Sequence, residues 1–245
     1  WQRLALLPLV HYLRGWDVQA AGRVDHFVAN SRTTAARIAK YYRRQADVIH
    51  PPIQADRFHV AVGPEDYFLI VSRLQRYKRL DVAIAAFNQL KLPLRIVGRG
   101  PDRSRLEALA GPTVQFLGEL TEAELSEAYS RCQALIFPGL EDLGLVPLEA
   151  MASGRPVLAF GAGGALDTVV PDVTGLFFRE QSPDAIVAAV EAFQVHDFDP
   201  RRLRGHALEF DVGRFKRKIA AFIARVASMP RDQTPMTATL DPIGE

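Results

Sequence analysis

Short apolar runs alternate with helical segments from Tyr67 onward, and this alternation constrains the fold more than any other feature of the sequence. The runs that suit strands are 68–71, 94–97, 114–117, 134–137 and 157–160. Helices are predicted between them, near residues 79–90, 102–109, 122–131 and 145–153. Continuously apolar strands separated by helices form parallel sheets covered on both faces. Right-handed crossovers then predict a doubly wound, Rossmann-like α/β domain.

Two further helices are expected to complete this domain, which we assign to residues 65–228. One helix is predicted from Pro183 to about Gln194, with Ser182 as its cap and the proline in its first turn. The other is an amphipathic run over residues 212–226. Residues 229–245 lack periodicity and contain proline, threonine and aspartate, so we expect a disordered tail.

The first 50 residues have a different organisation. We predict an amphipathic helix over residues 1–20, a strand at 27–29, a helix at 33–43 and a strand at 46–50. Pro51 and Pro52 end that strand, so residues 51–64 are interpreted as a linker between domains. The first helix is expected to pack on a domain body, and peripheral contact with the inner face of the plasma membrane is the alternative.

Charge and composition exclude some classes of protein. The net charge is +2, from 30 basic and 28 acidic groups, which does not suit a nucleic-acid-binding protein. One cysteine, Cys132, fits a reducing compartment and precedes an apolar run, so we expect a buried thiol and a cytoplasmic protein. No histidine pair has metal-ligand spacing, and Asp197-Phe198-Asp199 is interpreted as a turn or helix cap. We therefore expect no metal site.

The loop at residues 72–79 brings four cations to the end of a predicted strand. They are Arg73, Arg76, Lys78 and Arg79. Ligands of open parallel sheets bind beyond the carboxyl ends of the strands, and these side chains favour phosphate oxygens. A solvated basic loop is the alternative interpretation.

The loop at residues 98–101 contains Gly98 and Gly100, which would let a ligand approach the backbone closely. A dinucleotide fingerprint would have a third glycine at position 103, which is Arg103 here. The sequence therefore weighs against a nicotinamide cofactor, and a plain turn is the alternative.

The loop at residues 138–150 follows a predicted strand and opens a helix. Backbone amides near residues 143–146 would point at an anion. Glu141 precedes the helix and Glu149 lies inside it, and carboxylates beside an anion site suit sugar hydroxyls. A helix-start charge and a surface residue are the alternatives for these two glutamates.

Together these loops resemble the retaining GT-B glycosyltransferases of family 4. The Glu-x7-Glu motif of that family is matched by Glu141 and Glu149, and its Arg-x4-Lys pair by Arg73 and Lys78. The similarity extends over about residues 20–228 and is closest to bacterial mannosyltransferases that use GDP-mannose. That group usually has phenylalanine at position 143, where this sequence has Leu143.

The resemblance implies a role for each candidate residue. Arg73 and Lys78 would hold the donor diphosphate and stabilise the departing charge. Glu141 would contact the transferred sugar, assisted by the segment Leu143-Gly144-Leu145, and Glu149 would bind the ribose. Gly98, Gly100 and Leu117 would border the base.

The resemblance also implies an activity: retaining transfer of a hexosyl group, mannose in particular, from a nucleotide diphosphate sugar without a resident cofactor. The acceptor would be a hydroxyl of a glycan or lipid-linked glycan in cell-surface polysaccharide synthesis. Residues 1–50 would be the end of an acceptor-binding domain, so the chain alone is expected to be inactive. A nucleotide-sugar 2-epimerase of the same architecture and a non-catalytic sugar-nucleotide-binding module are the alternatives.

Overall fold

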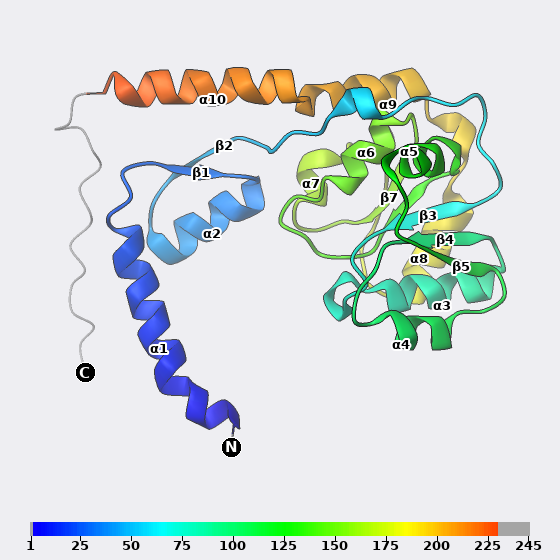
Figure 1. The fold of residues 1–245 in the computed structure, drawn as a ribbon, viewed down its shortest axis with the longest axis horizontal. Coiled ribbons are helices and arrows are strands. Elements are labelled where there is room, and N and C mark those ends of the chain that lie inside the picture. The colour runs from blue at the N-terminus through cyan, green and yellow to red at the C-terminus, as the bar shows by residue number, and fades with distance from the viewer. Residues whose placement is uncertain (1, 230–245) are drawn as a thin grey trace. The chain divides into compact units, whose positions relative to one another are not determined.

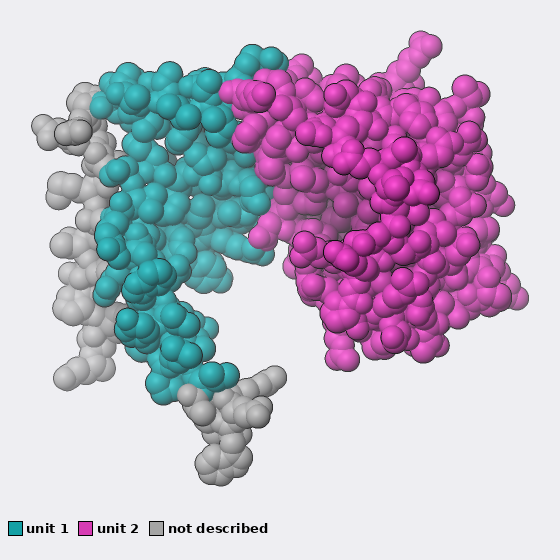
Figure 2. All heavy atoms as spheres, viewed as in Figure 1, with its two compact units in different colours: residues 1–49, 217–245 teal, residues 50–216 magenta. Residues whose placement is uncertain are grey.

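The computed structural model describes residues 2–229, and the chain forms two compact units (Figure 2). The larger unit is continuous and contains residues 50–216, whereas the smaller unit combines the residues before 50 with those after 216. The first boundary lies beside the one expected at residue 50. The second passes through the last helix, which the sequence analysis assigned entirely to the donor domain. The predicted tail from residue 230 onward lies outside the described residues.

A parallel sheet of six strands forms the centre of the larger unit. Its strand order is β5-β4-β3-β6-β7-β8. The strands are β3 (Phe68–Val71), β4 (Leu94–Val97), β5 (Val114–Gly118), β6 (Leu135–Phe137), β7 (Val157–Phe160) and β8 (Gly175–Phe178). Five of these were predicted, and β8 was missed because this short edge strand begins with a glycine.

Helices cover both faces of this sheet, as predicted (Figure 1). One layer contains α3 (Leu80–Leu90), α4 (Arg103–Leu109) and α8 (Pro183–Ala192). The other contains α5 (Glu122–Arg131), α6 (Val146–Ala152), α7 (Ala165–Thr168) and α9 (Pro200–Ala207). The core lies between the layers, where aliphatic strand residues such as Leu69, Leu94 and Ile136 are almost completely buried. Their burial from water is the main favourable contribution to folding.

Short polar side chains set the starts of several helices. Ser182 accepts a hydrogen bond from the Ala185 amide and caps α8, as predicted. Asp199 accepts from the Arg201 amide and caps α9. The helix-cap interpretation of the Asp-Phe-Asp sequence is therefore confirmed for its last residue.

The smaller unit contains α1 (Gln2–Ala21), β1 (Phe27–Ala29), α2 (Arg32–Tyr42), β2 (Ala46–Val48) and the greater part of α10 (Val212–Ala227). Strands β1 and β2 pair in parallel, and Ser31 caps α2. The large apolar side chains of α1 from Leu6 to Trp16 are exposed, and α1 contacts α2 near its C-terminal end, where the Tyr42 hydroxyl donates a hydrogen bond to Asp17. Both interpretations of α1 stay predictions.

Residues 51–64 form one short helical turn, at Ala55–Arg57, and belong to the larger unit, to which hydrogen bonds attach them. The Arg204 guanidinium in α9 donates hydrogen bonds to the carbonyls of Ala55, Phe58 and Ala152. Arg155 is buried and donates to the carbonyl of Ala61. The segment expected to be a linker is therefore bound, from Ile53 to Ala61, to the domain that follows it.

Candidate nucleotide-sugar site

The six strands are parallel, but the order in which the chain adds them reverses between β3 and β6. We call this boundary the reversal point. The chain proceeds from β3 outward to β4 and β5, and then returns to place β6 on the other side of β3. The loops that follow β3 and β6 therefore diverge at the carboxyl edge of the sheet, which is where ligands of doubly wound folds bind. These two loops carry Arg73, Lys78 and Glu141.

Lys78 and Glu141 form an ion pair across the reversal point. Lys78 ends a short 3-10 turn (Arg76–Lys78), and its ammonium also lies 5.0 Å from the centre of the Tyr77 ring. The side chains of Lys78 and Glu141 are only 12% and 23% exposed, so solvent screens their attraction weakly. The structure thus joins two residues that the sequence assigned to different parts of one ligand.

Arg73 is placed differently. It lies in the same loop after β3, but its side chain is exposed and has no ion-pair partner among the described residues. A guanidinium in this position is available to an anion that reaches the carboxyl edge of β3. The structure does not bring it into contact with Lys78 or Glu141, so its role as a phosphate ligand stays a prediction.

Glu149 lies in the first turns of α6, where it is partly buried rather than on the surface. The hydroxyl of Tyr129, in α5, donates a 2.7 Å hydrogen bond to Glu149 Oε2. Burial raises the pKa of Glu149 above its ordinary value, and the Tyr129 hydrogen bond and the nearby Arg57 charge oppose this shift. Tyr129 was missed in the sequence because a tyrosine on the buried face of a helix resembles any other core residue.

The two glycines after β4 allow close contact between the loop after β4 and the loop after β3. Gly98 has a φ of +127°, and a Cβ atom there would lie 2.0 Å from the Ser72 carbonyl oxygen. A Cβ atom at Gly100 would lie 2.2 Å from the Leu74 carbonyl oxygen. The Leu74 amide donates a 2.9 Å hydrogen bond to the Arg99 carbonyl. These glycines therefore allow the loops after β3 and β4 to touch, and their contact with a base stays a prediction.

The loop after β6 rests on the loop after β7. The Gly164 amide donates a 2.8 Å hydrogen bond to the Glu141 carbonyl, and a Cβ atom at Gly164 would lie 2.1 Å from the Cα of Leu143. Gly144 has a φ of +83° and packs against the Phe137 ring. This contact supports the loop that presents Glu141 and so positions its carboxylate.

Binding of an anion by the segment Leu143-Gly144-Leu145 requires that this segment be exposed, and it is only partly exposed. Leu143 is buried and Leu145 is exposed. None of the three amides donates a hydrogen bond to a residue between 2 and 229. They remain candidates for binding a ligand.

A depression of about 600 Å³ lies between the loops after β3 and β4, with Tyr77 and Pro101 among its lining residues. Leu117, in β5, is half-buried next to the carboxyl end of its strand. Neither observation shows a bound base. The depression adjoins the loop that carries the proposed phosphate ligands, whereas Leu117 lies two strands away from that loop in the sheet.

The remaining polar candidates do not form a metal centre in the described part of the chain. Between residues 2 and 229, no three histidine, cysteine, aspartate or glutamate side chains are grouped as metal ligands would be. Cys132 is completely buried, and burial raises the pKa of its thiol to about 12. This agrees with the expected structural thiol.

Between residues 2 and 229, no helix has the length and apolar character needed to cross a membrane.

Comparison with known proteins gives the family. The profile described as "Glycosyl transferases group 1" matches residues 53–203. The chain is 37% identical to the GDP-mannose-dependent alpha-mannosyltransferase of Mycolicibacterium smegmatis, over 78% of the chain and 53% of that protein. It is 38% identical to the protein of the same description from Mycobacterium tuberculosis, over 54% of the chain and 36% of that protein. The chain thus spans between about a third and a half of these relatives.

Solved structures give the fold. Sucrose-phosphate synthase from Thermosynechococcus elongatus matches with a TM-score of 0.78 and 22% identity, over 86% of this chain and 60% of that one. The Anabaena protein HepE, solved in complex with UDP-glucose, matches with a TM-score of 0.75 and 21% identity, over 86% of this chain and 67% of that one. These likenesses confirm the predicted GT-B architecture. With its motifs, its doubly wound sheet and a family match over most of its length, the chain belongs to the group 1 glycosyl transferases.

Proposed function

We propose that the larger unit binds a nucleotide diphosphate sugar and that the protein containing this chain transfers the sugar, with retention, to a hydroxyl acceptor. The observation that carries this proposal is the ion pair between Lys78 and Glu141 at the reversal point of the sheet. A cation and a carboxylate at one point suit a ligand that carries phosphates at one end and sugar hydroxyls at the other.

Lys78 and Arg73 are the proposed diphosphate ligands. When the bond between the sugar and the diphosphate breaks, negative charge grows on the departing phosphate. Two cations beside the departing phosphate stabilise that charge, and electrostatic stabilisation of this kind is usually the largest contribution to catalysis. This arrangement provides the electrostatic stabilisation from the chain's own residues, so we propose that no resident cofactor is required.

In our proposal, Glu149 and Glu141 bind the ribose and the transferred sugar of the donor, respectively. Glu149 accepts hydrogen bonds from the ribose hydroxyls, and its partly buried position inside α6 supports a fixed contact. Glu141 accepts from hydroxyls of the transferred sugar, which it reaches when the phosphates draw Lys78 away. Gly98, Gly100 and Leu117 border the base.

We propose mannose as the sugar and GDP-mannose as the donor. Two relatives that are described as GDP-mannose-dependent support this choice, whereas the HepE complex with UDP-glucose makes UDP-glucose the main competitor. The proposed acceptor is a glycan or a lipid-linked glycan of a cell-surface polysaccharide. Peripheral contact with the cytoplasmic face of the membrane belongs to the same proposal.

A thermal-shift screen of the chain with GDP-mannose, UDP-glucose and ADP-glucose tests the donor. Stabilisation by GDP-mannose at the lowest concentration is the expected result, because a ligand that binds only the folded state raises the melting temperature. The Lys78→Ala variant is the matched control and should lose most of the shift. No shift with any of the three donors would overturn the proposal.

A further inference from the structure

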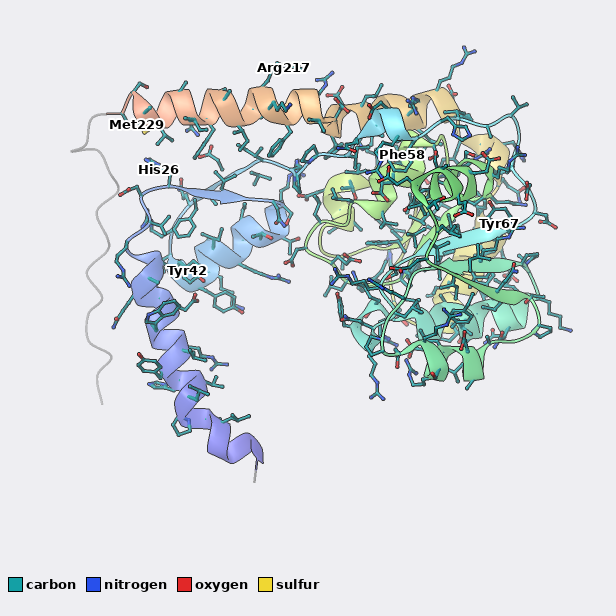
Figure 3. The ribbon with its side chains drawn as sticks, viewed as in Figure 1. His26, Tyr42, Phe58, Tyr67, Arg217 and Met229 are labelled. Atoms are coloured by element: carbon teal, nitrogen blue, oxygen red, sulfur yellow. The ribbon has the colours of Figure 1, made fainter. Side chains whose placement is uncertain are left out.

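Tyr129 is fully buried, and its hydroxyl donates a hydrogen bond to Glu149. The ring packs edge-on against Phe58, with 5.7 Å between the ring centres, and the carbonyl of Phe58 is held by Arg204. Phe58 is labelled in Figure 3. The hydroxyl donates to Glu149 Oε2, and the desolvated phenol has a pKa raised well above its ordinary value. It therefore stays protonated and donates throughout the physiological range.

The carboxylate of Glu149 consequently has unequal oxygens. Oε2 accepts the Tyr129 hydrogen bond, whereas Oε1 accepts none from the described residues. Among these residues, Asp81 Oδ1 is the one buried side-chain polar atom without a hydrogen-bond partner. Oε1 is thus not sealed in the core, and it is the oxygen that a ligand can reach.

We infer that Tyr129 is a positioning residue, which holds Glu149 so that its second oxygen meets the ribose hydroxyls of a nucleoside diphosphate. This inference rests on the proposed function, in which Glu149 binds the ribose. It adds a residue from a different helix, one that touches no substrate. Tyr129 acts entirely through the carboxylate of Glu149.

Orientation is important here because a glutamate side chain has three rotatable bonds and ribose presents two neighbouring hydroxyls. Hydrogen bonds weaken steeply when donor and acceptor are misaligned. A carboxylate that is already fixed in the unliganded protein does not lose side-chain freedom on binding. Removal of the tyrosine hydroxyl should therefore weaken the contribution of the ribose hydroxyls to affinity and leave the phosphate contribution intact.

The test compares two probes, GDP and 2′,3′-dideoxy-GDP, by calorimetric titration of the wild-type chain and of Tyr129→Phe. We expect wild type to prefer GDP, and Tyr129→Phe to lose about tenfold in GDP affinity while its affinity for the dideoxy probe stays nearly constant. Tyr67→Phe is the matched control. Tyr67 is also buried, but its hydroxyl donates at 2.9 Å to the backbone carbonyl of Ala128, so this variant should retain the preference for GDP.

A second variant, Glu149→Asp, tests the ribose contact of Glu149 on which this inference rests. Glu149→Asp retains the charge and leaves Tyr129 intact, but its shorter side chain cannot reach both Tyr129 and the ribose. It should also lose the preference for GDP.

The outcomes separate the two proposals. If wild type binds neither probe, the proposed function fails and this inference fails with it. If wild type prefers GDP and Tyr129→Phe keeps the full preference, Tyr129 has only a structural role and the proposed function stands. Equal losses for both probes in Tyr129→Phe would likewise leave Tyr129 with a structural role alone.

Discussion

The side chains of Lys78 and Glu141 are joined by an ion pair that links the loop after β3 to the loop after β6. The pair is largely shielded from solvent, so neither charge can lose its partner without a large cost. In the proposed function, a donor diphosphate therefore competes with Glu141 for Lys78, and the effects of single substitutions follow from this competition.

Lys78→Ala should weaken GDP binding more than Arg73→Ala does. Loss of a charge-assisted contact is worth about 1.5–3 kcal/mol, so each variant should lose roughly tenfold or more. Lys78→Ala also leaves Glu141 unpaired beside the phosphates, which repels them. Calorimetric titration with GDP and with guanosine measures the effect, and guanosine affinity should hardly change.

Two further variants control this prediction. Addition of Glu141→Gln to Lys78→Ala should restore part of the GDP affinity, since it removes the unpaired carboxylate. Lys91→Ala removes an exposed lysine that precedes β4 at the opposite edge of the sheet and should have no effect. Equal losses for GDP and guanosine in Lys78→Ala would exclude a phosphate role.

Glu149→Gln should weaken GDP itself, whereas Glu141→Gln should mainly weaken GDP-mannose. The reason is that only Glu149 is proposed to meet the ribose, which both ligands contain. Titration of the two ligands against both variants gives four affinities. If Glu141→Gln reduces GDP affinity as much as Glu149→Gln does, the proposed division between the glutamates is wrong.

Glu149 should make the stability of the protein fall as pH rises. Burial raises its folded-state pKa above the ordinary value of 4.5. Between that value and the raised pKa, the folded state binds more protons than the unfolded state, so the free energy of unfolding decreases with increasing pH. Above the raised pKa this contribution is constant.

Urea unfolding of wild type and Glu149→Gln at a series of pH values above 4.5 isolates this effect. The difference in free energy of unfolding, wild type minus variant, should decrease across the window because glutamine does not titrate. A difference that rises with pH would mean that the folded protein favours the charged carboxylate.

Gly98→Ala should strongly destabilise the larger unit. Its positive φ disfavours alanine, and the added Cβ would meet the Ser72 carbonyl oxygen at 2.0 Å. Gly205→Ala is the control, because Gly205 lies in α9 with nothing within 4 Å of the added atom. There alanine should stabilise by about 0.5–1 kcal/mol. Urea unfolding measures both, and a neutral Gly98→Ala would show that the two loops separate easily.

The chain alone should bind GDP-mannose without transferring mannose at a useful rate. The described residues contain one doubly wound sheet, and a transferase also needs a surface that holds the acceptor against the donor. Positioning of two reactants contributes about 7–11 kcal/mol to catalysis. Release of GDP in the presence of candidate glycan acceptors measures the activity. Robust transfer by this chain would show that the acceptor surface lies within it.

The sequence predicted the repeated part of the fold well and its contacts poorly. Five strands of the sheet and the helices between them follow from apolar periodicity, because each run must bury both of its faces. Strand β8 escaped because its first residue, Gly175, is a turn signal. In the structure this glycine is needed for close packing of β8 against β7, because a Cβ atom at Gly175 would lie 1.9 Å from the Val157 carbonyl oxygen.

The candidate site shows the same limit. The positions of Lys78 and Glu141 after predicted strands made them candidates, and the resemblance to the glycosyltransferase family supported Glu149, which lies inside a helix. The roles of all three stay predictions. The partners of these residues were not predictable. The hydrogen bond from Tyr129 to Glu149 joins two helices, and the ion pair joins two loops, so both depend on packing that no local pattern records.

The glycines at the carboxyl edge of the sheet tie the site loops to one another. Gly98 and Gly100 bring the loop after β4 against the loop after β3, and Gly164 brings the loop after β7 against the loop after β6. An insertion or a bulkier residue in one loop would therefore displace its neighbour as well. We therefore expect that grafting a single loop from a relative would also disturb the loop that it touches. Exchange of two touching loops together should preserve these contacts.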